Sequence, residues 1–293
     1  IALPDVAVVT NVHPAHLEGF GSLDAIAREK TSIAEGLGSG GAFIVNGDIA
    51  RLLEAARAKS ERLRTFGCKA DCDYRAERVR CEGETSRFEI NGREMTLGLA
   101  GRGNVENALA AWAICAECGL SAEQFAGALE SMPAVAMRAE MLQLGPLRVL
   151  NDCYNANPAS MRNALEILKR LEPAGGGRRV FICGDMAELG GQAEQLHREL
   201  AADIVNAQVE MVAAVGPLSA VAAERAVALA ESSGRGPMHV RYFESAAAAC
   251  NNVHDLVGNG DIILVKGSRS AGLEVLVEKL KDRFPQTVAE SQA

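Results

Sequence analysis

The segment RRVFICGD, at residues 178–185, is a short apolar run that ends in Gly-Asp. Runs of this kind are typical of buried strands. Similar runs are EMVAAVG (210–216), MHVRYF (238–243) and DIILVKG (261–267). Each of the four precedes a segment with helical spacing, and strands that alternate with helices form parallel sheets with right-handed crossovers. This part of the chain is therefore predicted to be an α/β domain built on a doubly wound, Rossmann-like sheet.

The residues before about 136 follow a mixed pattern. Apolar or alternating runs predict strands at 5–11, 41–46, 63–67, 74–81, 86–90 and 93–99. Helical spacing predicts helices at 23–37, 104–119 and 121–132. The pair Asn91-Gly92 between the last two strands is a strong hairpin signal. The change of pattern predicts two domains, at residues 1–136 and 137–293.

The composition excludes several classes of protein. Of the 293 residues, 48% are hydrophobic and 23% are charged, which is ordinary for a chain that buries a core. The net charge of −8 argues against a nucleic-acid partner, because such proteins normally carry a basic face. The longest apolar run, Ala108 to Ala116, is too short for a membrane span, and the first residues lack the pattern of a secretory signal. Eight cysteines are too sparse for a disulfide scaffold, so we expect reduced thiols in a cytoplasmic protein.

A polar loop, TNVHPAHLEGFGS (10–22), follows the first predicted strand. Its Asn11, His13, His16 and Glu18 offer metal ligands or phosphate contacts within a few residues. The same pattern fits a capped loop whose histidines bond backbone groups, and spacing alone favours that interpretation.

Two other features of the first domain are weaker indications of a functional site. Lys30 lies in a predicted helix, where a lysine is usually a solvated surface charge. Gly101-Arg-Gly103-Asn104 opens another helix, and a helix N-terminus preceded by glycines can receive an anion. The spacing is not that of a dinucleotide fingerprint, because residue 106 is Glu.

Three polar loops follow strands of the second domain. They are NDCYNANPASM (151–161), GDMAELG (184–190) and LVKGSRS (264–270). The first ends the predicted strand 147–151 and enters a helix with Asn157 as N-cap and Pro158 at the first position. Because the carboxyl ends of parallel strands meet at one edge of a sheet, the three loops together predict a binding site. Lys266 and Arg269 in the third loop suit a carboxylate or a phosphate.

The motifs NVHPAHLEGFGS, GNVENALAA, NDCYNANPASM, GDMAELG and LVKGSRS, in this order and spacing, resemble those of the Mur ligases. The resemblance covers essentially the whole chain, and YNANP, GDMAELG and KGSR are typical of one branch. It implies an ATP- and Mg²⁺-dependent amide ligase that adds D-alanyl-D-alanine to UDP-N-acetylmuramoyl-tripeptide. Such an enzyme acts in the cytoplasm in peptidoglycan synthesis, and thus in cell wall biogenesis, cell shape and cell division.

The resemblance also implies a domain organisation. Residues 1–136 correspond to the second half of a P-loop-type central ATPase domain, and residues 137–293 to a Rossmann-like C-terminal domain. The sequence G-x-x-x-x-G-K-[ST] does not occur in the chain, so we expect that the chain starts inside the central domain and is inactive alone. Gly103 stands where the family usually has His before Asn104, which puts any contact of that His in doubt. We expect a monomer.

Residue roles carried over from the family are expectations of the same kind. His16 would ligate Mg²⁺, and Lys30, once carbamylated, would support a second Mg²⁺. Asn104 and Asn107 would face the adenine. The remaining roles fall in the second domain: Arg138 on the ATP phosphates, Asp152 on the ribose, and Tyr154, Asn155, Asn157, Lys266, Ser268 and Arg269 on the side of the amine substrate.

Two alternatives remain open. One is another ligase of the same superfamily, such as the diaminopimelate- or lysine-adding enzyme or folylpolyglutamate synthase, which YNANP and KGSR disfavour. The other is a non-catalytic module that binds a nucleotide or peptide, which the absence of a Walker A motif favours.

Overall fold

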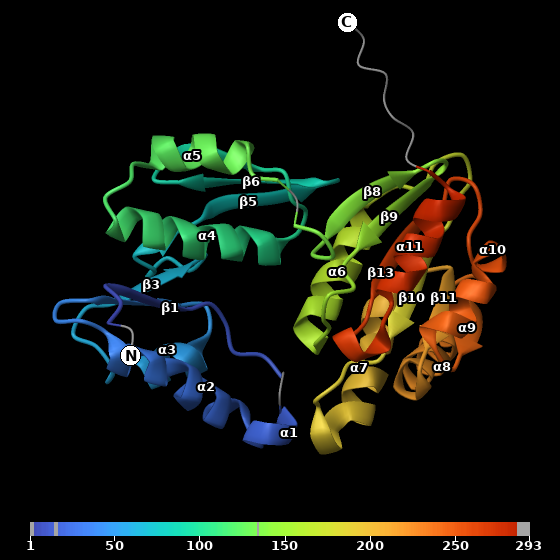
Figure 1. Ribbon diagram of the computed structural model, residues 1–293, viewed down its shortest axis with the longest axis horizontal. Helices are drawn as coiled ribbons and strands as arrows, with labels where there is room; N and C mark the ends of the chain where they lie inside the picture. Colours follow the sequence, from blue (N-terminus) through green and yellow to red (C-terminus); the bar gives the residue numbers. More distant parts are fainter. Residues whose placement is uncertain (1–2, 15–16, 134, 286–293) are drawn as a thin grey trace, which may run out of the picture. The chain divides into compact units, whose positions relative to one another are not determined.

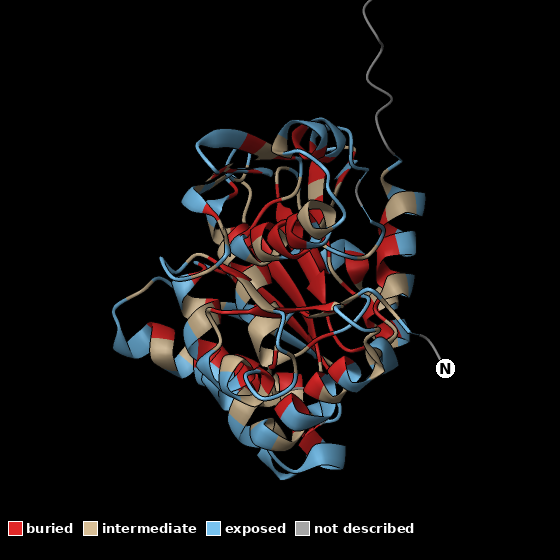
Figure 2. Ribbon diagram, turned by 90° about the vertical axis from the view of Figure 1, so that its left-hand side faces the viewer, coloured by how far each residue is buried: buried red, intermediate tan, exposed pale blue. Residues whose placement is uncertain are grey.

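The chain divides into two compact units, Ile1–Pro133 and Ala134–Ala293. The computed structural model describes residues 3–14, 17–133 and 135–285 (Figure 1). None of the helices in these ranges is long and apolar enough to cross a membrane. Buried residues gather in the strands and on the inner sides of the helices (Figure 2).

The first unit is built on a parallel sheet. Its strands, in spatial order, are β1 (Val6–Val9), β2 (Ala42–Asn46), β3 (Leu63–Gly67) and β4 (Tyr74–Arg75). Helices α2 (Leu23–Thr31) and α3 (Ala50–Ala56) pack together and α3 contacts β2, while α4 (Arg102–Glu117) packs on all four strands. Because helices cover the sheet, every residue of β2 is buried. The apolar run 41–46 thus forms a buried strand, as predicted, while β1 alternates between half-buried and buried residues.

A second, antiparallel sheet completes this unit. It consists of β5 (Glu77–Glu82), β6 (Thr85–Ile90) and β7 (Arg93–Leu97). Asn91 and Gly92 both have positive φ, of 52° and 77°, in the β6–β7 turn, which is the conformation that makes Asn-Gly a hairpin signal. Helix α4 lies between the two sheets, and α5 (Ala122–Glu130) packs against α4 and β7 (Figure 1).

The helix predicted over 23–37 is shorter in the structure. After a single turn, α1 (Leu17–Phe20), helix α2 ends at Thr31 and continues as the 3-10 turn η1 (Ser32–Gly36). The Thr31 hydroxyl donates to Arg28 O (3.0 Å) and the Ser32 hydroxyl to Glu29 O (2.7 Å). Side-chain hydroxyls that bond to nearby carbonyls compete with the helical backbone, so the α-helix stops there.

The second unit holds a six-stranded sheet. Its spatial order is β12 (His239–Phe243), β11 (Met211–Val215), β10 (Arg179–Gly184), β13 (Ile262–Lys266), β9 (Leu147–Asn151) and β8 (Glu140–Leu144). The first five strands are parallel, which confirms the predicted α/β fold. Strand β8 is antiparallel to β9 and was not predicted.

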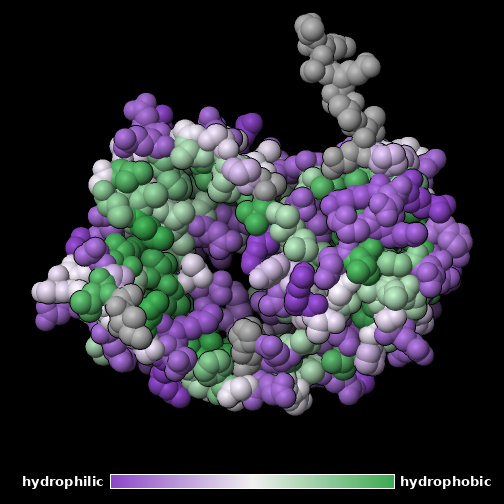
Figure 3. All heavy atoms as spheres, viewed as in Figure 1, coloured by the Kyte–Doolittle hydropathy of each residue, from purple (hydrophilic) through white to green (hydrophobic). Residues whose placement is uncertain are grey.

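Helices cover both faces of this sheet. On one face lie α6 (Pro158–Arg170), α7 (Ala193–Asn206) and α8 (Pro217–Ser232), which contact one another in sequence. On the other lie α9 (Ala246–Asn251), α10 (Val253–Leu256) and α11 (Glu274–Arg283), whose apolar residues share one core with the strands. The exposed side chains of α11 are hydrophilic except for Val275, and hydrophilic groups gather on that part of the surface (Figure 3). The 3-10 turns η2 (Gly190–Gln192) and η3 (Arg269–Ala271) lie in the loops after β10 and β13, at the carboxyl edge of the sheet.

Candidate functional site

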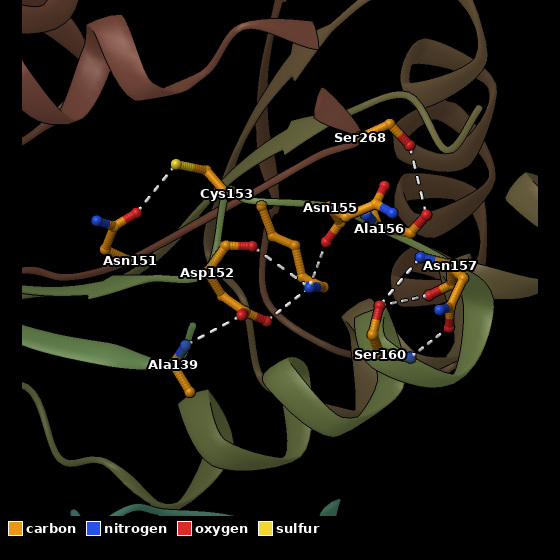
Figure 4. Close-up of polar contacts among 10 residues, drawn as sticks. Ala139, Asn151, Asp152, Cys153, Asn155, Ala156, Asn157, Ser160 and Ser268 are labelled. Carbon is orange, nitrogen blue, oxygen red and sulfur yellow. Dashed lines mark hydrogen bonds and ion pairs between the residues drawn. The ribbon is translucent and has the colours of Figure 1, made fainter. Parts of the chain in front are cut away.

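A buried ion pair joins the carboxyl ends of β9 and β13. Lys266, the last residue of β13, is 1% exposed. Its ammonium donates to Asp152 Oδ2 (2.6 Å), to Asp152 O (3.3 Å) and to Asn155 O (3.0 Å), as Figure 4 shows. An ammonium has three donors, so these contacts satisfy Lys266 completely. The structure therefore places Lys266 beneath the surface, where it holds the loop after β9.

The same loop enters α6 as the sequence predicts. Asn157 Oδ1 accepts from Ser160 N (2.9 Å) and Ser160 Oγ accepts from Asn157 N (3.0 Å), with Pro158 at the first helical position. This reciprocal cap uses the backbone N–H and the side-chain oxygen of Asn157 within the helix start. Tyr154 and Asn155, by contrast, are exposed.

Ser268 links the three polar loops of the second unit. Its backbone N donates to Asp185 O (2.9 Å), its hydroxyl accepts from Ala187 N (2.7 Å), and the hydroxyl lies 3.4 Å from Ala156 O. The side chain is 3% exposed. The predicted meeting of the three loops at one edge is therefore present, and a buried serine connects them.

The loop GDMAELG is fixed by a contact of its own Asp185 and by His197, a residue that sequence analysis did not select. Asp185 Oδ1 accepts from Ser219 N (2.6 Å) in the first turn of α8. His197, fully buried on α7, accepts from Met186 N at Nε2 (2.9 Å) and donates from Nδ1 to Ala193 O (2.7 Å). Burial lowers the pKa of His197, which keeps the ring neutral and able to accept. A single His in a helix carries no sequence signal for this contact.

The contact of Asp185 also fills the N-terminus of α8. Gly216, with φ 110°, precedes this helix, and the Asp185 carboxylate lies 2.7 Å from where a Cβ would sit. Dinucleotide-binding Rossmann domains hold their pyrophosphate at such a helix start. Here a carboxylate of the chain itself interacts with the helix dipole at that position.

Two arginines of the second unit lie at the surface near these loops. The guanidinium carbon of Arg138 is 4.2 Å from the centroid of the Tyr154 ring. Arg269 has a side chain that is 58% exposed and lies 3.5 Å from Glu274 Oε1 and 3.8 Å from Met137 Sδ. The site thus combines exposed groups that could contact a ligand with a support made by the partly buried Asp152 and by the buried Lys266 and Ser268.

The first unit carries the other predicted residues. Lys30 Nζ, at the end of α2, donates to Asn11 O (3.1 Å) just after β1, and partial burial lowers the pKa of its ammonium. His16 lies outside the described residues. Asn104 donates to Ala100 O (2.8 Å) at the start of α4, and Asn107 on the same helix is exposed.

Side chains that bind metal ions do not form a cluster in the described part of the chain. Within residues 3–14, 17–133 and 135–285, no group of three or more His, Cys, Asp or Glu side chains is placed to hold a metal ion.

Family models match both units of the chain. The Mur ligase middle domain matches residues 1–115, and the Mur ligase glutamate ligase domain matches residues 137–269. The chain belongs to the Mur ligase family. The order of the two matches agrees with the order of the motifs along the sequence.

Individual Mur ligases are similar to this chain along most of its length. UDP-N-acetylmuramoyl-tripeptide--D-alanyl-D-alanine ligase of Bacillus subtilis is 34% identical over 96% of this chain, and that of Escherichia coli is 32% identical over 95%. A crystal structure of MurF from Acinetobacter baumannii matches 95% of this chain with a TM-score of 0.80 and 28% identity. The chain spans about 60% of the length of each of these relatives.

Proposed function

We propose that this chain provides the middle and C-terminal parts of an ATP-dependent ligase that adds D-alanyl-D-alanine to UDP-N-acetylmuramoyl-tripeptide. The names of the most similar relatives support this substrate pair. The observation that carries the proposal is the meeting of three motif loops at one sheet edge, held by Ser268 and by the Lys266–Asp152 pair. The reaction would take place in the cytoplasm, with the protein as a monomer, as part of cell wall synthesis.

The reaction explains the need for cations. A carboxylate is a poor electrophile, so ATP supplies a phosphoryl group that turns the tripeptide carboxylate into an acyl phosphate. The amine of D-alanyl-D-alanine then attacks the acyl carbon, and phosphate leaves as the amide forms. Negative charge gathers on phosphoryl oxygens, so positive groups contribute most of the stabilisation. In this proposal Arg138 contacts the phosphates, Asp152 the ribose, and Asn104 and Asn107 the adenine.

Lys30 fits the role of a carbamylated metal support. Its lowered pKa increases the fraction of neutral amine, which is the form that can add CO₂. The resulting carbamate is an oxygen ligand of the type that Mg²⁺ prefers. His16 would complete the metal site.

On the amine-substrate side, the burial of Lys266 separates the roles of the two predicted cations. Lys266 supports the loop, and the exposed Arg269 is the group that could bind the carboxylate of D-alanyl-D-alanine bidentately. Asn155 offers an exposed polar group in the loop after β9, while Asn157 and Ser268 hold the loops in place.

Replacing Arg269 by Ala should raise the KM for D-alanyl-D-alanine about 10- to 150-fold. A charge-assisted hydrogen-bonded pair contributes about 1.5–3 kcal/mol, and every 1.4 kcal/mol is tenfold in affinity. The measurement uses a chimera in which the segment of the Bacillus subtilis relative that precedes its matching region is joined to Ile1. The matched control is Lys279→Ala, which removes an exposed cation on α11. A selective rise in the KM for ATP in Arg269→Ala would place this residue on the nucleotide side.

The two alternatives are less well supported. For the non-catalytic module that binds a nucleotide or a peptide, Asp185 at the N-terminus of α8 argues only against a pyrophosphate at that helix start. Turnover by the chimera distinguishes an enzyme from such a module. Another ligase of the superfamily would share the fold. The identity of the amine substrate therefore decides between the D-alanyl-D-alanine ligase and these relatives.

A further inference from the structure

Arg138 lies between two residues with unusual backbone conformations. Met137 has φ 58° and Ala139 has φ 51°. Residues other than glycine rarely adopt this left-handed region, and two of them flank a single arginine here. Such conformations persist only when surrounding contacts determine them, and they cluster at functional sites.

Three hydrogen bonds tie this segment to β8 and to the loop after β9. Ala139 N donates to Asp152 Oδ1 (3.0 Å), Met137 N donates to Glu140 Oε2 (3.1 Å), and Tyr154 N donates to Met137 O (3.3 Å). The acceptors are themselves fixed. Asp152 pairs with the buried Lys266, as described above, and Glu140 Oε2 also accepts from Asn151 Nδ2 (2.9 Å).

The side chain of Arg138 is held as well as its backbone. Its guanidinium stacks over the Tyr154 ring at 4.2 Å, within the range of a cation–π contact. Tyr154 is 44% exposed, so the stack stands at the surface of the unit. The guanidinium carbon lies over the ring, and a guanidinium carries five N–H donors, so donors remain that can bind an anion.

We propose that Tyr154 is a positioning residue that holds the guanidinium of Arg138 ready for an anionic ligand, with Asp152 and Lys266 anchoring the strained segment. Tyr154 then acts through Arg138 and needs no contact with the amine substrate. The nature of the anion, a phosphoryl group of ATP, rests on the function proposed above. The stack itself is a property of this chain and can be tested without any activity.

The first arm of the test is spectroscopic and uses the 293-residue chain. The Nε–H signal of Arg138, identified by its loss in Arg138→Lys, should show an upfield ring-current shift in wild type. The shift should persist in Tyr154→Phe, which keeps the ring, and disappear in Tyr154→Leu. An unchanged Arg138 signal in Tyr154→Leu would overturn the proposal.

The second arm measures kinetics in the chimera. Tyr154→Leu should raise the KM for ATP about two- to fivefold, the equivalent of an exposed cation–π contact, and leave the KM for D-alanyl-D-alanine unchanged. Tyr154→Phe should behave as wild type. A rise in the KM for D-alanyl-D-alanine, or equal damage by Phe and Leu, would contradict the assigned role. If the wild-type chimera did not turn over, the proposed function would fail, and the spectra would still decide whether Tyr154 holds Arg138.

Discussion

Replacing Lys266 by Met should lower the free energy of unfolding of the second unit by about 3–5 kcal/mol. Removing one partner of a buried ion pair leaves the other as an uncompensated charge, and this is what makes the loss large. Here the change leaves the Asp152 carboxylate without its cation, with only the Ala139 N–H as a described donor, and it also removes donors from two backbone carbonyls. Hydrogen exchange of peptides from β9 and β13, followed as a function of urea concentration, reports this unit separately from the first.

Two matched variants show whether the pairing is the cause. Asp152→Leu combined with Lys266→Met removes both charges and should recover a large part of the loss, because no unpaired charge remains. Lys279→Met, an exposed lysine on α11, should change the stability by no more than about 0.5 kcal/mol. A double variant as unstable as Lys266→Met alone would show that the two charges do not act as a pair.

Replacing Lys30 by Ala in the chimera should lower kcat at least about 100-fold while the protein still folds. Losing one group that stabilises developing charge typically costs about 10²–10³ in kcat. Lys30 lies at the exposed end of α2, so its removal leaves the core of the first unit intact. Acetate or bicarbonate added to Lys30→Ala should restore part of the activity by supplying a carboxylate.

A second variant separates the carbamate from the positive charge. Lys30→Arg keeps the charge and cannot form a carbamate, so it should be as inactive as Lys30→Ala. A ¹³C signal from labelled CO₂, present in wild type and lost in both variants, would identify the modification directly. Full activity in Lys30→Ala without any additive would refute the proposed role.

The strands of the second unit could be predicted because their signals are local. Each is a short apolar run that stops at a polar residue or Gly, and β13 and β10 match the predicted runs to within a residue or two at each end. The start of α6 was predicted for the same reason, since Asn157 and Pro158 act on their own helix. Strand β8 was missed because Glu140–Leu144 alternates only weakly, and its antiparallel pairing depends on the turn at Gly145.

The buried contacts that hold the site loops could not be predicted, because they join residues that are distant in the sequence or lie on different elements. Lys266 looks in the sequence like a surface cation beside Arg269. Only the folded chain shows that its ammonium is buried against Asp152 and Asn155, more than a hundred residues earlier. His197 is a similar case, since its partner Met186 lies on another element. The sequence could identify the loops that meet, while the structure was needed to divide exposed residues from supporting ones.

We propose that this chain belongs to a ligase whose amine substrate is D-alanyl-D-alanine. The most direct test measures ADP release by the chimera with UDP-N-acetylmuramoyl-tripeptide, ATP and Mg²⁺, while D-alanyl-D-alanine, D-alanine, L-lysine, diaminopimelate and L-glutamate are offered one at a time. We expect turnover that requires both the tripeptide and D-alanyl-D-alanine, and no turnover by the 293-residue chain alone. Turnover by the chimera with L-glutamate, L-lysine or diaminopimelate in place of D-alanyl-D-alanine would contradict the proposed substrate. Turnover by the 293-residue chain alone, near a typical enzyme value of about 10 s⁻¹, would contradict the expectation that the chain is inactive alone.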